Sequence, residues 1–206
     1  MNDFLVVRAE KSMALDLLKF CFENRGHLEN YVDWAIEARY WGIYEFEVLL
    51  TSFENEPLPS ETVFIYYKGK IVGSGRIAQV KPLPPQIMYF VGKDWEGKGL
   101  ATAIARKLLE QAFEVRKYPA VRALVDVSNL ASQRVLEKVG GIKVGEVHGK
   151  PHAWKETGHR HIYEIKNPSF PQNHTQTSLV RNADLTQDLS SGLFAYLISF
   201  LPTSRN

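Results

Sequence analysis

The stretch that most constrains the fold runs from residue 87 to residue 112, where an apolar run leads through glycines into a helical pattern. The run Ile87-Met88-Tyr89-Phe90-Val91 has the length and the β-branched and aromatic content of a buried strand. Beyond Gly97 and Gly99, apolar residues recur at helical spacing, namely Leu100, Ile104, Leu108, Leu109 and Phe113. The sequence therefore predicts a strand, a glycine turn and a helix, in that order.

The two glycines predict an anion-binding turn. Gly97 and Gly99 have no Cβ atom, so the backbone can turn tightly and a ligand can approach its N–H groups. These groups open the predicted helix, where unpaired donors and the positive end of the helix dipole favour phosphate or pyrophosphate. A P-loop is disfavoured because Gly99, and not Ser or Thr, follows Lys98. A dinucleotide fingerprint fits poorly because Thr102 stands at its third glycine position.

The same stretch resembles the acetyl-CoA loop of the GNAT N-acetyltransferases. That loop has Gln or Arg, two further residues, Gly, one residue, and then Gly or Ala. Glu96, Gly99 and Ala101 occupy these positions, and Glu96 departs from the preference for Gln or Arg. The resemblance implies that backbone N–H groups from Gly97 to Thr102 hold the CoA pyrophosphate, with Lys98 or a nearby base assisting.

A second motif follows at a fitting distance. Residues 123–127 have the pattern of a buried strand, and residues 129–140 that of a helix that Ser128 or Asn129 can cap and that the Gly140-Gly141 pair ends. This helix resembles its counterpart in the GNAT subgroup of ribosomal-protein N-terminal acetyltransferases, on the residues Asn129, Ser132, Glu137, Lys138 and Gly140. The subgroup usually has Phe after the last glycine. Here Gly141 stands there, and we expect Ile142 to supply the apolar contact.

The resemblance, which covers roughly residues 4 to 167, also implies a site. The residues expected to bind the cofactor are Phe90, Val91, Gly92, Gly97, Lys98, Gly99, Leu100, Ala101, Thr102, Asn129 and Ser132. Many GNAT enzymes protonate the departing thiolate with a Tyr at the position of Leu136, so Ser132 is expected to take this role. A backbone N–H between Phe90 and Gly92 is expected to hold the oxyanion. The subgroup's carboxylate base has no equivalent here, which leaves His152 or His148, acting directly or through water, with Glu146 or bulk water as the alternatives.

The remainder of residues 1–167 predicts a mixed sheet flanked by helices. Strands are expected at 4–9, 63–67, 70–77, 142–148 and 159–166, with a hairpin turn at Lys68-Gly69. A helix is expected from about residue 12 to residue 24, with a stop at Gly26, followed by one or two aromatic-rich helices. In the resembled family these helices form one wall of the acceptor groove, so Tyr31 and Tyr40 are candidate substrate-binding residues, with core packing as the alternative. The resemblance further implies that the central strand and its successor splay apart.

Residues 168–206 read as a linker and a C-terminal helical extension. Apolar residues from Leu185 to Phe200 can share one helical face, which we expect to pack on its own domain or across a homodimer. The uninterrupted apolar run from Leu193 to Leu201 is shorter than the ~20 residues that span a bilayer. Association with a membrane surface is a distant third alternative because the segment has few basic residues, so no membrane partner is expected.

The charge balance and the cysteine and histidine residues limit the ligands and partners expected for this chain. Lys plus Arg number 25 and Asp plus Glu 23, without a dense basic run, so nucleic acid is not an expected partner. The single cysteine, Cys21, lies among apolar residues and is expected to be a buried core thiol. His159 and His161 alternate on one strand face, but no carboxylate or cysteine completes a ligand set, so no metal is expected. No secretory signal is apparent, and the cytoplasm is the expected compartment.

Taken with the resemblance, these patterns predict a single-domain GNAT-like α/β fold. The expected activity is transfer of acetyl from acetyl-CoA to a primary amine, with a protein or peptide amino terminus slightly favoured. A polyamine or another small-molecule amine is the alternative acceptor. A CoA-binding interaction module without turnover is the alternative from another class.

Overall fold

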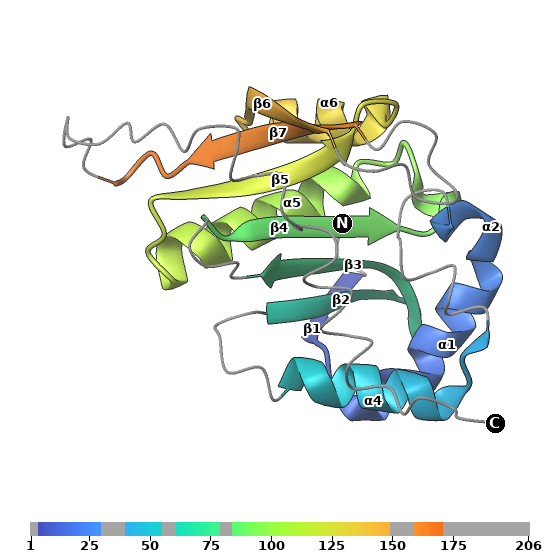
Figure 1. Ribbon diagram of the computed structural model, residues 1–206. Coiled ribbons are helices and arrows are strands. Elements are labelled where there is room, and N and C mark those ends of the chain that lie inside the picture. Colours follow the sequence, from blue (N-terminus) through green and yellow to red (C-terminus); the bar gives the residue numbers. More distant parts are fainter. Residues whose placement is uncertain (1–3, 30–39, 55–60, 79–83, 149–158, 171–206) are drawn as a thin grey trace. The chain divides into compact units, whose positions relative to one another are not determined.

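The computed structural model describes residues 4–29, 40–54, 61–78, 84–148 and 159–170. Within these ranges seven strands form one hydrogen-bonded sheet in the order β1-β2-β3-β4-β5-β7-β6 (Figure 1). The strands are β1 (Phe4–Arg8), β2 (Glu61–Tyr67), β3 (Lys70–Ala78), β4 (Gln86–Val91), β5 (Ala120–Asp126), β6 (Ile142–His148) and β7 (His159–Lys166). The β4–β5 pair is parallel, whereas β1–β2, β5–β7 and β6–β7 are antiparallel. The mixed α/β sheet that the sequence predicts is therefore confirmed.

The helices expected near residues 12–24, 100–113 and 129–140 are present, whereas the aromatic-rich stretch from Tyr31 to Phe46 is described only from residue 40, and its helix begins at Ile43 and continues to Glu54. The helical elements are η1 (Lys11–Met13), α1 (Ala14–Glu23), α2 (Arg25–Leu28), α4 (Ile43–Glu54), η3 (Lys93–Trp95), α5 (Leu100–Glu110), the π-helical η4 (Gln111–Val115) and α6 (Leu130–Lys138). The expected stop at Gly26 is wrong, because α1 ends at Glu23 and Gly26 lies inside α2. The chain turns at Asn24 instead, whose backbone N–H still donates to the Phe20 carbonyl. None of the helices in the described ranges has both the length and the apolar character needed to cross a membrane.

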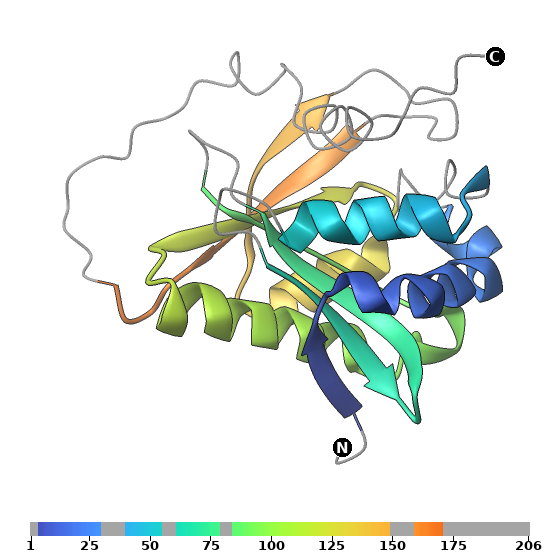
Figure 2. The same cartoon turned by 90° about the horizontal axis from the view of Figure 1, so that it is seen from below.

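The described residues fall into two compact units, and the first combines residues up to 76 with residues 89–101. Its core forms where α1 and α4 pack against β2 and β3, and α1 and α4 lie beside each other in both views (Figures 1 and 2). The buried residues of this core are Ala9, Ala14, Leu17, Phe20, Cys21, Leu28, Phe46, Leu49, Leu50, Phe64 and Ile71.

The predicted hairpin of this unit is confirmed. Between β2 and β3, Lys68 and Gly69 both have positive φ, at 48° and 76°. Two consecutive left-handed residues match the right-handed twist of the strands they connect. Strand β3 is buried along almost its whole length, which makes it a central strand of the unit.

The second unit consists of residues 77–88 and the described residues from 102 onward. Strand β5 pairs with β7 along its whole length, from Ala120 opposite Lys166 to Asp126 opposite Arg160. Alternate residues of β5 are buried, as expected for a strand with one face on the core. Strand β4 pairs with β5 at Gln86 and Arg122. That the two strands diverge beyond this pair stays a prediction.

The geometry at the C-terminus of α6 explains why Gly140 and Gly141 are both glycine. Gly140 has φ +90° and the Gly141 N–H donates to the Leu136 carbonyl at 2.8 Å, a left-handed helix C-terminus. A Cβ at Gly141 would lie 2.9 Å from this carbonyl oxygen, so a larger residue would require the backbone to shift. The expectation that Ile142 supplies an apolar contact here is wrong, because 68% of its surface is exposed.

The core of the first unit gives a prediction for Cys21. Burial raises the pKa of this thiol to about 12, which leaves roughly one thiol in 10,000 ionised at pH 8. We expect native protein to react very slowly with a thiol reagent such as DTNB at this pH, and protein in a denaturing concentration of guanidinium to react at once. Rapid reaction of the folded protein would contradict a buried Cys21.

Candidate functional site

The loop between β4 and α5 has the conformation that its glycines predict. After the extended Gly92 and the turn η3, Gly97 and Gly99 have φ +70° and +80°, and α5 begins at Leu100. A Cβ added at either glycine would meet no atom within 4 Å. Backbone conformation, and not crowding, is therefore the reason for glycine at both positions.

This loop presents the N-terminus of α5 to solvent. Gly97, Lys98 and Gly99 are exposed, and the first turn of α5 contains no acidic residue. The first N–H groups of a helix have no carbonyl partner within it, and the dipole makes this end positive. Gly99 offers no side-chain acceptor, so these donors suit an anion such as a diphosphate.

The side chains of the loop make contacts of their own. Glu96, which departs from the family pattern, has its carboxylate 3.0 Å from Lys93 Nζ and 3.7 Å from His27 Nε2. The Lys98 ammonium lies 5.2 Å from the centre of the Trp95 ring. Trp95 in turn packs against the rings of Phe4 and Tyr67. The loop is thus anchored by an aromatic cluster and carries an exposed cation, consistent with the assisting role predicted for Lys98.

The end of β4 is also constrained. Phe90 packs against Phe20, with ring centres 5.9 Å apart, so its side chain belongs to the core. The Gly92 N–H donates to the Val72 carbonyl at 2.9 Å. The expectation that this particular N–H holds an oxyanion is therefore wrong, because the donor is already engaged. The prediction now rests on the N–H groups that precede Gly92.

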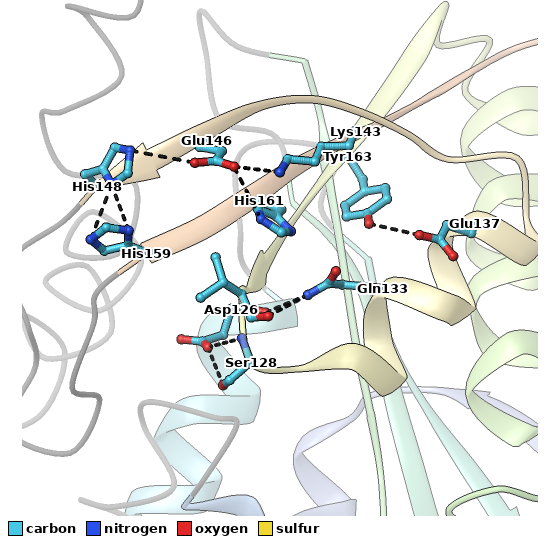
Figure 3. A network of polar contacts seen from close by, with 11 residues as sticks. Asp126, Ser128, Gln133, Glu137, Lys143, Glu146, His148, His159, His161 and Tyr163 are labelled. Atoms are coloured by element: carbon cyan, nitrogen blue, oxygen red, sulfur yellow. Dashed lines mark hydrogen bonds and ion pairs between the residues drawn. The ribbon is translucent and has the colours of Figure 1, made fainter.

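In the second unit, Asn129 caps α6, which confirms the predicted capping of this helix by Ser128 or Asn129. Its side-chain oxygen accepts the Ser132 backbone N–H at 3.0 Å. Gln133 is buried and its amide donates to the carbonyls of Asp126 and Val127, which ties α6 to the end of β5 (Figure 3). Ser132 is half-buried on this first turn. The sequence motif contained no separate signal for Gln133.

Histidines and carboxylates meet across β6 and β7 (Figure 3). His148 Nδ1 lies 2.9 Å from His159 Nδ1, and His161 Nε2 lies 3.4 Å from a Glu146 carboxylate oxygen. Glu146 also accepts from Lys143 Nζ at 2.6 Å, and this contact is the main cause that lowers the pKa of its carboxyl. The carboxylate form of Glu146 is thus favoured beside the imidazoles. His161 was not among the predicted site residues, although its alternation with His159 placed both on one strand face.

The predicted site residues fall into separate sets. The first unit holds Phe90 to Ala101, and the second holds Thr102, Asn129, Ser132 and His148. Thr102 is on the same helix, α5, as the end of the loop. Tyr40 has 82% of its surface exposed. Tyr31 and His152 lie outside the described residues, as do the linker and the predicted C-terminal helix beyond residue 170.

Comparison with known proteins defines the family. The profile of the Acetyltransferase (GNAT) domain matches residues 8–142. This match includes both sequence motifs and ends at the start of β6, before β7. The chain belongs to the GNAT acetyltransferases, a family of acyltransferases.

One known protein is similar in sequence over part of this chain. YdaF of Bacillus subtilis (strain 168), provisionally described as a ribosomal N-acetyltransferase, is 38% identical over 61 residues, which are 30% of this chain and 33% of that protein. The match therefore spans about a third of the relative's length.

Two solved structures share the fold. RimL, described as a ribosomal L7/L12 alpha-N-protein acetyltransferase in complex with coenzyme A, has a TM-score of 0.72 at 13% identity, covering 81% of this chain and 95% of its own. A chimera of the spermidine N-acetyltransferase SpeG from Vibrio cholerae and hSSAT has a TM-score of 0.66 at 13% identity. The similarity covers 81% of this chain and 96% of the chimera.

The loop geometry gives a prediction for CoA binding. Gly99→Asn and Gly99→Asp add side chains of nearly equal size, and both residues tolerate the left-handed region. The Asp carboxylate would face the anion, so we expect CoA affinity to fall about tenfold further for Gly99→Asp than for Gly99→Asn. Titration calorimetry with CoA, alongside circular dichroism to verify folding, measures the difference. Equal affinities of the two variants would reject the assignment of the phosphate site to this turn.

Proposed function

We propose that the chain transfers acetyl from acetyl-CoA to a primary amine, with a protein or peptide amino terminus as the acceptor. The observation that carries this proposal is the left-handed Gly97 and Gly99 turn opening α5, in a chain whose residues 8–142 match the GNAT domain. The open space around both glycines fits close approach of a diphosphate to the backbone.

Acetyl-CoA supplies the acetyl group as a thioester, and the protein's own groups handle charge and protons. N–H groups from Gly97 to Thr102, with Lys98, hold the diphosphate. The amine nitrogen forms a bond to the acetyl carbon while the carbon–sulfur bond breaks. In this proposal Ser132 is the group near the sulfur, and its hydroxyl donates a proton to the leaving thiolate while it regains one from water. Asn129 supports Ser132, because it holds the first turn of α6.

A proton must also leave the alkylammonium form of the acceptor before it can attack. General-base help of this kind is worth roughly 10² to 10⁴ in rate. His148 and His152 are the candidate bases. His148 is exposed, and a Glu146 carboxylate oxygen lies 3.8 Å from its Nε2.

The names of YdaF and RimL favour a ribosomal protein as the acceptor. The fold shared with the spermidine acetyltransferase chimera supports the second candidate, a polyamine. Tyr40, which is exposed, and Tyr31 are the residues that we propose contact the acceptor. We further propose that the enzyme works in the cytoplasm, where acetyl-CoA is available, without a metal, a nucleic acid or a membrane as partner. The C-terminal extension would then pack on its own domain or across a homodimer.

Thiol release tests the activity. We expect free CoA to form when acetyl-CoA is mixed with a peptide carrying a free amino terminus, more slowly with the same peptide blocked at that end and carrying a lysine, and more slowly with spermidine. Ser132→Ala should lower kcat at least about tenfold, because the thiolate then leaves without a proton donor. A protein that binds CoA but releases none with any amine would instead be a non-catalytic CoA-binding module.

The pH profile tests the base. If a histidine accepts the proton, kcat/KM should rise between pH 6 and 7.5, where imidazole ordinarily titrates. The variant that removes this histidine, His148→Ala or His152→Ala, should lower kcat/KM and abolish the rise. If both variants keep the wild-type profile, the proton goes to another group or to bulk water.

A further inference from the structure

The junction between α1 and α2 reaches into the loop that follows β4. Asn24, which separates the two helices, accepts the Lys93 backbone N–H on its Oδ1 at 2.8 Å. Its Nδ2 donates to the Phe20 carbonyl at 3.0 Å. Because both ends of the amide are engaged, its oxygen is held toward the loop.

Gly92 shows how closely this contact is packed. A Cβ at Gly92 would lie 2.9 Å from Asn24 Oδ1 and 3.2 Å from a Phe20 ring carbon. The φ of Gly92 is −63°, which any residue can adopt. Glycine at this position is therefore explained by the close approach of Asn24, and not by backbone conformation.

His27 makes the second contact between α2 and the loop. Its Nε2 lies 3.2 Å from the Val91 carbonyl oxygen and 3.7 Å from Glu96 Oε1. Both neighbours can only accept, so Nε2 carries a hydrogen. The His27 side chain is 10% exposed, which places this donor in a largely water-excluded position between the end of β4 and Glu96.

The charge of Glu96 makes His27 important to an anionic ligand. A carboxylate beside a diphosphate site repels the ligand unless nearby donors compensate it. The Lys93 ammonium and the His27 N–H both face this carboxylate. They draw Glu96 toward α2 and Lys93.

We propose that Asn24 and His27 are positioning residues of the cofactor site, holding the loop from Val91 to Glu96 so that the turn at Gly97 and Gly99 faces the diphosphate. This inference rests on the proposed function, because it assigns CoA to that turn. Neither side chain needs to touch the ligand. The helices α1 and α2 thereby become part of the machinery that binds the acetyl donor.

Calorimetric titration with CoA tests the two residues. Asn24→Ala and His27→Ala should each weaken CoA binding about tenfold, the effect of losing one hydrogen bond that orders the loop. His27→Gln should recover much of the affinity, since its amide N–H can still donate to the Val91 carbonyl. Lys19→Ala, which removes an exposed cation from α1, is the matched control and should bind CoA as the wild type does.

Two further readouts separate positioning from general destabilisation. In turnover, Asn24→Ala and His27→Ala should raise KM for acetyl-CoA while leaving kcat nearly unchanged. Gly92→Ala should weaken CoA binding on its own by displacing Asn24, and should have little additional effect in the Asn24→Ala background. Folded variants with wild-type affinity, or strictly additive effects of Gly92→Ala and Asn24→Ala, would overturn the inference. Absence of CoA binding by the wild-type protein would overturn the proposed function instead.

Discussion

The arrangement of the candidate site depends on two residues held in the left-handed region, Gly97 and Gly99. A side chain at such a position costs roughly 1–2 kcal/mol, so the turn is accessible mainly because both residues are glycine. The turn decides where α5 begins and which N–H groups remain outside its hydrogen-bonded ladder. Strong helix formers further along α5 could lengthen the helix, but they could not redirect its first turn.

The two helices of the sequence motifs begin in chemically different ways. At α6, the Asn129 side chain accepts the Ser132 N–H, so one first-turn donor is satisfied by the protein itself. At α5, the residue before the helix is Gly99, which has no side chain to offer. A capping oxygen there would compete with an anion for the same donors. The difference explains why α5 suits phosphate while α6 presents a serine side chain.

The local sequence pattern was sufficient to predict the strands, the Lys68-Gly69 hairpin and both ends of α6, because each of these depends on residues close together in the chain. Asn24 and His27 could not be found in this way, since their partners lie 69 and 64 residues away. Gly26 misled the prediction because glycine often ends a helix, yet here Asn24 makes the turn. Ile142 misled it because apolar character alone does not reveal which side of an edge strand faces solvent.

The burial of Cys21, the one cysteine of the chain, makes the molecule a convenient background for site-directed labelling. A cysteine introduced at an exposed position would be the only thiol open to a maleimide dye or a nitroxide reagent under native conditions. Lys98, exposed on the loop before α5, is a suitable position for such a probe. Fluorescence or electron spin resonance could then follow the loop directly, without first removing a native thiol from the core.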